Sequence, residues 1–530
     1  MQHIDSVIVA AYFVLILAAG WWIGRRHHAG SADDFISGGR TRSWWQIGLA
    51  LLGMAVDPGY MSIAGLGFVW GLYLTQWTGV HVWFTTWLAA MFFVPVYWRS
   101  HIVTTPEFLE RRFNVQTRVV FSLLMAVLLV LTLALGLYLG GLLLQELLGW
   151  SLRTSVICIA AVTGFYVLLG GMRTVLVLDT YQAIFLLVTL LLVGGMAIYQ
   201  VGGISGLAAI AATNAAGTRL PSVLPPSDWR LDTEAFFPVQ AILLWSTVVG
   251  LSWLACNFGM AQRLLAARSE RDAQKSLLFV GALVVVVPTC SFLVGVAMRH
   301  LHPDIVADTA FIRLMIDAFP VGLRGVLAAG MMAALLSTAD GLLTGSSGLL
   351  CQDIYLRFVR PGAGEAERKW FVRGVEVVSL AVAMLLVPVL AKSPTAMGLL
   401  QAYYADLFGV IVALYLAGMF TTRATPWAAL SSVVLGLATA IVLDVCTSLN
   451  FAYVGFFSFA ATLGLTLVLS RFESPVPRER LANLTVHTLE DVKGPWVGLH
   501  AWPALWRWAL ALAAGWFGLS AAWEVYVRSR

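Results

Sequence analysis

The chain has 530 residues, of which 59% are hydrophobic and only 12% are charged. Because a soluble domain carries about 25% charged residues, this composition excludes a soluble protein of this length. The net charge of +5 comes from basic residues spread through the predicted loops, so it does not indicate nucleic-acid binding.

Apolar segments recur along nearly the whole chain, and about fourteen of them approach the roughly 20 residues that cross a bilayer as a helix. The clearest are Val7–Ile23, Val82–Trp98, Val119–Leu147, Ser155–Gly170, Tyr181–Tyr199, Leu277–Val296, Val375–Ala391, Leu407–Phe420, Ala428–Leu443, Phe451–Ser470 and Ala504–Trp523. Three others have polar or glycine-rich interruptions: Trp45–Leu72, Val239–Asn257 and Gly325–Leu350. We therefore predict an all-α integral membrane protein with about 13–14 transmembrane helices.

The first segment is expected to remain as a membrane span. A signal peptide begins with basic residues, whereas residues 1–6 contain no Lys or Arg. Arg25 and Arg26 instead follow the segment directly. Basic residues concentrate in alternate loops when the N-terminus is placed outside, in agreement with the positive-inside rule. Only the basic C-terminal tail disagrees with the positive-inside rule.

The second span contains Asp57-Pro58-Gly59 in its middle. Proline removes a backbone donor and disfavours helical angles in the residue before it. We therefore expect the helix to unwind near mid-bilayer, where its free carbonyls need protein or a polar cavity around them. A carboxylate at that depth costs at least about 2.5–3.5 kcal/mol, so Asp57 should have a cation, a proton or a charged solute as its partner. A broken helix with a carboxylate is typical of an ion site in a transporter.

Further along, Ser337 and Thr338 follow Ala334 by three and four residues, so the three share one helix face. Their hydroxyl and carbonyl oxygens suit a hard monovalent cation, although such residues also pack membrane helices together. Asp179, at the start of another span, and Asp340 are each candidates for a second ion ligand, a proton carrier or a buried ion pair. The sequence leaves these alternatives open.

The five cysteines stand singly and show no metal or redox spacing. No nucleophile–base pair or metal cluster is evident at membrane depth, which argues against an enzyme.

Several stretches resemble the sodium/solute symporter family, which includes sodium/glucose, sodium/proline and sodium/sialic acid carriers. The resemblance covers roughly residues 5 to 470. It is carried, in order, by Asp34–Arg40 with Trp44–Trp45, Pro106–Phe113, Gly170–Gly171 with Asp179 and Gln182, Gln262–Arg263 with Ala266 and Ala267, Ala334–Thr338, Asp353–Tyr355 and Gly418–Arg423.

The resemblance implies a LeuT-type bundle, in which five helices are repeated upside down and the sites lie at broken helices. It implies a first helix and inner loop over residues 1–43, a transport core over 44–424 and peripheral helices over 425–530. By the same resemblance, the main sodium site takes carbonyls of Ala55 and Pro58, the carbonyl of Ala334, and the hydroxyls of Ser337 and Thr338.

Some ion-site positions depart from the family pattern. Asp57 matches an aspartate of the sodium/proline-like members, where sugar carriers have asparagine. Asp179 matches the acidic residue of a second sodium site in some members. Asp340 and Gly341 stand at two positions where hydroxyls would complete that second site, so a standard second site is in doubt.

Four residues are candidates for solute contact. Gln401 matches a polar residue that the sugar carriers use, and Tyr404 and Asp406 lie near it. Trp253 follows a glycine-containing break in the seventh span; stacking on the solute is one interpretation, and ordinary packing is the favoured one.

The predicted function is import of a small organic solute, driven by sodium and carried out by alternating access in a cell membrane, with the bacterial inner membrane as the expected location. Asp57 favours an amino acid or other zwitterion, while sugars, carboxylates and quaternary amines stay open. Proton coupling through Asp57 or Asp340 is the main alternative, and a membrane sensor is a weaker one. The expected partners are sodium, the solute and lipid.

Overall fold

The computed structural model describes residues 2–26, 40–55, 59–75, 84–213, 247–393, 396–489 and 503–528. Every named element in these ranges is a helix, and one isolated bridge joins Arg42 to Ala267. Among the described residues, eight helices are long and apolar enough to cross a membrane, and shorter apolar helices of 10–17 residues accompany them. The predicted all-α membrane class is confirmed.

The N-terminal part of the fold ends in a long helix that contains two of the expected spans. The elements are α1 (Gln2–Arg26), α3 (Trp44–Ala55), α4 (Gly59–Trp70), η2 (Leu72–Leu74), η3 (Ala89–Phe93), α6 (Val94–Arg99), α7 (Thr105–Arg112), α8 (Val115–Leu148), α9 (Leu152–Gln200) and α10 (Gly203–Thr213). Within α9, the apolar stretches Leu152–Phe165 and Leu178–Gln200 correspond to the spans expected at 155–170 and 181–199.

The C-terminal part alternates long helices with short 3-10 and π segments. Its elements are η4 (Ser252–Cys256), α12 (Phe258–Leu265), α13 (Glu270–Leu301), η5 (Ala307–Thr309), α14 (Ala310–Ala318), α15 (Leu323–Leu349), η6 (Leu350–Val359), α16 (Glu365–Leu390), α17 (Ala396–Phe420), α18 (Pro426–Cys446), α19 (Phe451–Leu469), η7 (Ser470–Phe472), η8 (Arg478–Leu481) and α20 (Pro503–Arg528).

Local sequence explains where the long helices begin and end. Asn114 starts α8 because its side chain accepts a hydrogen bond from the Thr117 amide, and Ser151 and Ser269 cap α9 and α13 in the same way. Gly149 ends α8 in the left-handed conformation, with φ of 72°, which glycine adopts without a steric penalty.

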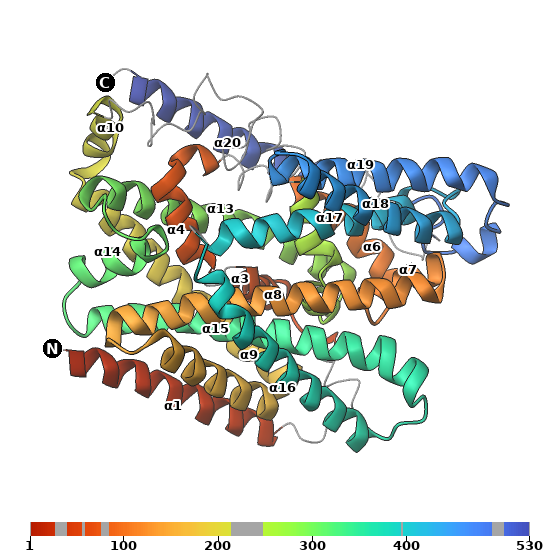
Figure 1. The fold of residues 1–530 in the computed structure, drawn as a ribbon, viewed down its shortest axis with the longest axis horizontal. Coiled ribbons are helices and arrows are strands. Elements are labelled where there is room, and N and C mark those ends of the chain that lie inside the picture. The colour runs from red at the N-terminus through yellow and green to blue at the C-terminus, as the bar shows by residue number, and fades with distance from the viewer. Residues whose placement is uncertain are drawn as a thin grey trace.

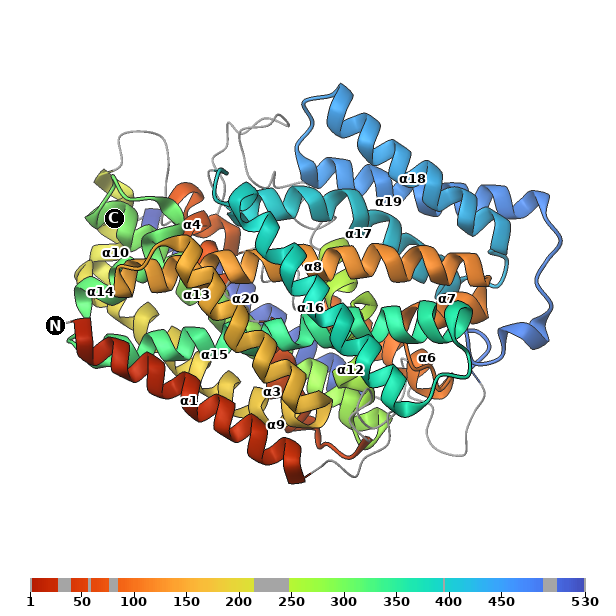
Figure 2. The ribbon, with the colours of Figure 1, turned by 60° about the horizontal axis from the view of Figure 1, so that its bottom comes forward.

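The helix α15 is the centre of the molecule. In its most apolar stretch 94% of the residues are buried inside the protein, whereas in the corresponding stretches of α16 and α18 only 28% are. It packs against α8, α9, α16 and α1, and α8 runs beside it along the long axis (Figure 1). Figure 2 shows α18 and α19 at the edge opposite α1. Helices α16 and α18 therefore present their apolar faces to lipid, and α15 does not.

The N-terminal helix holds the first turn of α15. The Asp5 carboxylate accepts hydrogen bonds from the Gly322 and Gly325 amides, at 2.8 and 3.0 Å, and pairs with Arg324. A carboxylate at a helix N-terminus satisfies amides that lack partners within the helix. Helix α1 therefore fixes one end of the central helix.

Candidate functional site

The second predicted span consists of two helices in the structure. Helix α3 ends at Ala55 and α4 begins at Gly59. The predicted ligand Pro58 and the carboxylate of Asp57 lie outside the described residues, while Ala55 is the half-buried last residue of α3. The two described helix ends therefore flank the stretch where the break was expected.

The hydroxyls predicted to bind sodium lie against α3. Thr338 Oγ1 is 3.4 Å from the carbonyl oxygen of Gly53, and both belong to buried parts of their helices. A methyl group added to Gly53 would come within 2.8 Å of Ser337 Oγ, so α3 and α15 approach closely only because residue 53 is glycine. Ala334 lies one turn earlier on α15 and is also buried. Hydroxyl and carbonyl oxygens from two helices are thereby brought together.

Asp179 lies directly beside this group. Ser337 Oγ donates a hydrogen bond of 2.6 Å to Asp179 Oδ1. The other carboxylate oxygen, Oδ2, accepts two hydrogen bonds from Arg263, at 2.7 and 3.1 Å. The predicted sodium ligand Ser337 and the predicted second-site residue Asp179 are thus in contact.

Arg263 joins Asp179 to the third predicted acid. Its guanidinium also lies 3.3 Å from Asp340 Oδ1, and the side chains of all three residues have 0% exposure. Helix α12 thus places Arg263 inside the protein, between α9 and α15. Hydropathy alone could not reveal this, since α12 is short and Asp179 is distant in the sequence.

On α17, Gln401 and Tyr404 lie on the buried face. Tyr404 shares a hydrogen bond of 2.5 Å with Thr132 of α8, and its ring lies 6.3 Å from that of Trp253. The buried Oε1 atom of Gln401 has no hydrogen-bond partner in the part of the chain that the structure describes. An unpaired buried acceptor is costly, so a ligand that donates a hydrogen bond would stabilise it.

Asp406 is separated from these residues. It follows Tyr404 by two positions, which is about 200° around an α-helix. Its carboxylate is half-exposed, and the like charge of Asp444 in α18 repels it. The structure therefore brings Gln401, Tyr404 and Trp253 toward one region and directs Asp406 elsewhere.

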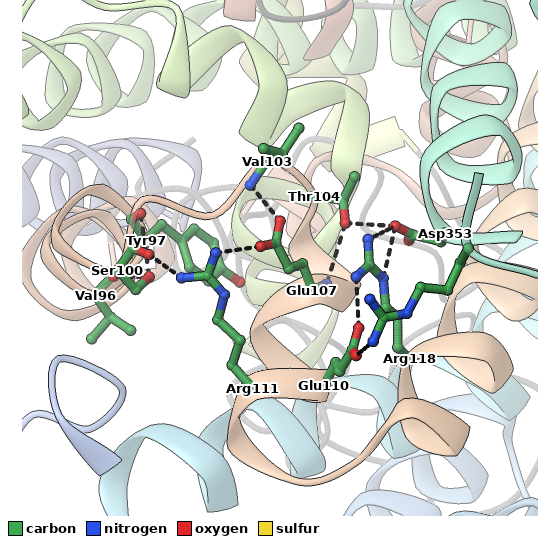
Figure 3. A network of polar contacts seen from close by, with 11 residues as sticks. Val96, Tyr97, Ser100, Val103, Thr104, Glu107, Glu110, Arg111, Arg118 and Asp353 are labelled. Carbon is green, nitrogen blue, oxygen red and sulfur yellow. Dashed lines mark hydrogen bonds and ion pairs between the residues drawn. The ribbon is translucent and has the colours of Figure 1, made fainter. Parts of the chain in front are cut away.

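The short helix α7 ties several elements together at one end of the molecule. Asp353 of η6 is fully buried and accepts hydrogen bonds from Thr104, Arg118 and Ser122. Arg118 also pairs with Glu110 of α7 at 2.6 Å (Figure 3). The π-helix that continues α15 is thereby anchored to α7 and α8.

The same helix α7 holds the end of α17. The side chain of Arg112, 1% exposed, donates hydrogen bonds to the carbonyl oxygens of Gly418, Thr421 and Ala424, at 2.8 to 2.9 Å. The last carbonyls of a helix lack partners within it, so this arginine acts as the C-terminal cap of α17. Helix α7 therefore connects the helix of Gln401 with the helix of Ser337.

At the other end, Asp308 makes a comparable link. It accepts a hydrogen bond of 2.7 Å from Ser62 of α4, and its second oxygen accepts one from the amide of Ala396 at the start of α17. Helix α4, the second half of the interrupted span, is thus joined to the beginning of α17.

Comparison with known proteins identifies the family. The model of the sodium:solute symporter family matches residues 35–436, most of the chain. The chain belongs to the sodium:solute symporter family. It is accordingly a membrane transporter and not an enzyme, with sodium and a small solute as its partners, as predicted.

Relatives that match most of the length of this symporter are named as cotransporters of sugars and inositol. It is 27% identical to sodium/glucose cotransporter 2 of Rattus norvegicus, over 91% of this chain and 80% of the relative. It is 30% identical to a sodium/mannose cotransporter of Bos taurus, over 82% and 78%. A sodium/myo-inositol cotransporter of Oryctolagus cuniculus is 26% identical over 86% and 75%.

Solved structures confirm the fold of the symporter. A Na+-coupled sialic acid symporter in a substrate-bound, outward-open state superimposes with a TM-score of 0.79 at 20% identity, covering 89% of this chain and 99% of that one. Mhp1, a nucleobase-cation-symport-1 family transporter, gives a TM-score of 0.55 at 14% identity, over 84% and 97%. The predicted LeuT-type helix bundle is confirmed.

Proposed function

We propose that this symporter couples inward sodium movement to uptake of an uncharged polyhydroxylated solute, a hexose or a cyclic polyol. Sodium would bind between the end of α3 and α15, with the carbonyls of Ala55, Pro58 and Ala334 and the hydroxyls of Ser337 and Thr338 as ligands. Support comes from the close approach of Thr338 and Ser337 to Gly53. Oxygen donors of this kind suit a hard cation.

The observation that carries the solute class is the buried Oε1 atom of Gln401, which has no hydrogen-bond partner among the described residues. A sugar or inositol hydroxyl can donate to this oxygen, and the apolar face of the ring can pack on the rings of Trp253 and Tyr404. The relatives named for glucose, mannose and inositol support the same class.

The proposed cycle follows from differential binding. Sodium joins α3 to α15 and so favours the outward-open arrangement, in which the solute reaches Gln401. The loaded bundle then rocks to face inward, and coupling arises because ion and solute both bind one arrangement more tightly than the other. We place this transport core at 44–424 and the peripheral helices at 425–530.

An amino acid or other zwitterion is the second candidate, because Asp57 stands in the interrupted span of the sequence. The deciding experiment is uptake into proteoliposomes under an inward sodium gradient, with D-glucose, D-mannose, myo-inositol and L-proline as labelled solutes. We expect saturable uptake of a hexose or inositol that stops when choline replaces sodium. Uptake of L-proline alone contradicts the solute class, and uptake driven by a pH gradient without sodium contradicts the coupling ion.

We also propose a bacterial inner-membrane location with the N-terminus outside, on the basis of the basic residues that follow the first span. A cysteine introduced at residue 2 should react with a membrane-impermeant maleimide in intact spheroplasts. Reaction only after permeabilisation would reverse the orientation.

A further inference from the structure

The buried cluster of Asp179, Arg263 and Asp340 has no role in the coupling cycle described so far. It joins three elements, because Asp179 lies in α9, Arg263 in α12 and Asp340 in α15. A carboxylate at this depth is costly without a cation close by. The identity of that cation decides how many sodium ions the site can take.

Both oxygens of Asp179 are already engaged. Oδ2 accepts from Nε and a terminal nitrogen of Arg263, and Oδ1 accepts from the hydroxyl of Ser337. A sodium ion that bound Asp179 would therefore have to displace the guanidinium or the hydroxyl. The cation that Asp179 requires is supplied by the chain itself.

Arg263 is held firmly in this position. Its Nη1 atom lies 3.2 Å from the carbonyl oxygen of Gly259 and 3.1 Å from the sulfur of Met54. Helix α12 is fixed at its start by Asn257, whose side chain caps the Gly259 amide at 2.9 Å. A guanidinium does not lose its proton in proteins, so this is a permanent positive charge that is covalently part of the transporter.

We propose that Arg263 is a built-in cation that takes the place a second coupling ion would hold at Asp179, so that this symporter binds a single sodium ion per cycle. Asp340 of α15 supports this role, because its carboxylate forms an ion pair with the same guanidinium. Arg263 also acts as a positioning residue, because it fixes Asp179, and Asp179 Oδ1 in turn accepts the hydrogen bond that the Ser337 hydroxyl donates. The lone pairs of Ser337 are then directed toward the sodium ion. The inference rests on the proposed sodium site at Ser337 and Thr338.

A purely structural cross-link between the three helices is the competing interpretation, and ion counting separates the two. The measurement is equilibrium binding of radiolabelled sodium to the purified full-length protein in detergent, which needs no solute. We expect the wild type to bind about one ion per chain with a Hill coefficient of about 1, since that coefficient cannot exceed the number of sites. A wild type that binds two ions overturns the proposal whatever the variants do.

The informative variant is the double substitution Arg263→Gln/Asp340→Asn, which removes one positive and one negative charge and so leaves the charge of the cluster unchanged. It frees Asp179, and we expect about two bound ions and a Hill coefficient that rises toward about 2. Arg263→Lys retains the charge and should still bind about one ion. A double variant that folds, as judged by size-exclusion chromatography, and still binds one ion overturns the proposal.

Ser337→Ala in the wild-type background tests the underlying site separately. Loss of the single ion in this variant supports the sodium site, whichever count the double variant gives. A wild type and a Ser337→Ala variant that bind sodium equally well would instead overturn the proposed site.

Discussion

Two neighbouring hydroxyls on α15 have different partners. Ser337 donates to a carboxylate of α9, whereas Thr338 lies against a carbonyl oxygen of α3. The first is oriented by a charged group, and the second is oriented only by the close approach of two helices. Sodium affinity should therefore depend on both residues, but through different contacts.

We predict that Thr338→Ala raises the sodium concentration for half-maximal uptake by about tenfold or more, because losing one ligand of a buried ion costs on the order of 1–3 kcal/mol. Asp57→Ala should also weaken sodium activation. The matched control is Thr344→Ala on the same helix, since that hydroxyl donates within α15, to the carbonyl of Asp340. Unchanged sodium activation in both Thr338→Ala and Asp57→Ala would remove the assignment.

The two polar residues of α17 offer a second comparison at this scale. Gln401→Ala should raise the KM for the transported hexose or inositol by about tenfold, because the solute hydroxyl loses its acceptor. Asp406→Asn should leave KM within about twofold, since substitutions away from the buried face cost within about 0.5 kcal/mol. Equal effects of the two substitutions would show that the buried face of α17 does not contact the solute.

Helices α4 and α13 pack closely against each other at two glycines. A methyl group on Gly295 would lie 2.1 Å from the carbonyl oxygen of Ala64, and one on Gly67 would lie 2.7 Å from that of Phe292. These contacts are between backbones, so neither helix can yield by a side-chain rotation. Helices α4 and α13 should accordingly move as one body.

We predict that Gly295→Ala destabilises the protein by about 1–3 kcal/mol, the usual cost of overpacking a dense interface. The control is Gly464→Ala in α19, where an added methyl group meets nothing within 4 Å. Thermal denaturation of the two variants in detergent gives the comparison. A melting temperature for Gly295→Ala equal to that of Gly464→Ala would contradict the rigid pairing of α4 and α13.

The elements also show what sequence reasoning can reach. Apolar runs predicted the membrane class, and the spacing of Ala334, Ser337 and Thr338 placed them on one face of a buried helix. Contacts made by backbone oxygens leave no mark on side-chain patterns, so Gly53 was not foreseen. The ion pairs of Arg263 were not foreseen either, because its partners Asp179 and Asp340 come from helices that are distant in the sequence.

For the whole molecule, transport of an uncharged solute with one sodium ion moves one net charge across the membrane. A potential of 100 mV then contributes about 2.3 kcal/mol, which corresponds to about 50-fold accumulation. We predict that an inside-negative potassium diffusion potential, set with valinomycin, increases initial uptake into proteoliposomes at a fixed sodium gradient. Uptake that is indifferent to the potential would contradict the movement of net charge with the solute.

The two attachments made by α7 should respond differently to ionic strength. Arg112 donates its hydrogen bonds to buried backbone carbonyls at the end of α17, and these carbonyls carry no titratable charge. Neither salt nor ordinary changes of pH should therefore weaken this contact. Glu110, by contrast, pairs with Arg118 and with the half-exposed Arg357 of η6, where dissolved ions can compete. High ionic strength would thus relax the hold of α7 on η6, the π-helical extension of α15, while its hold on α17 stays constant.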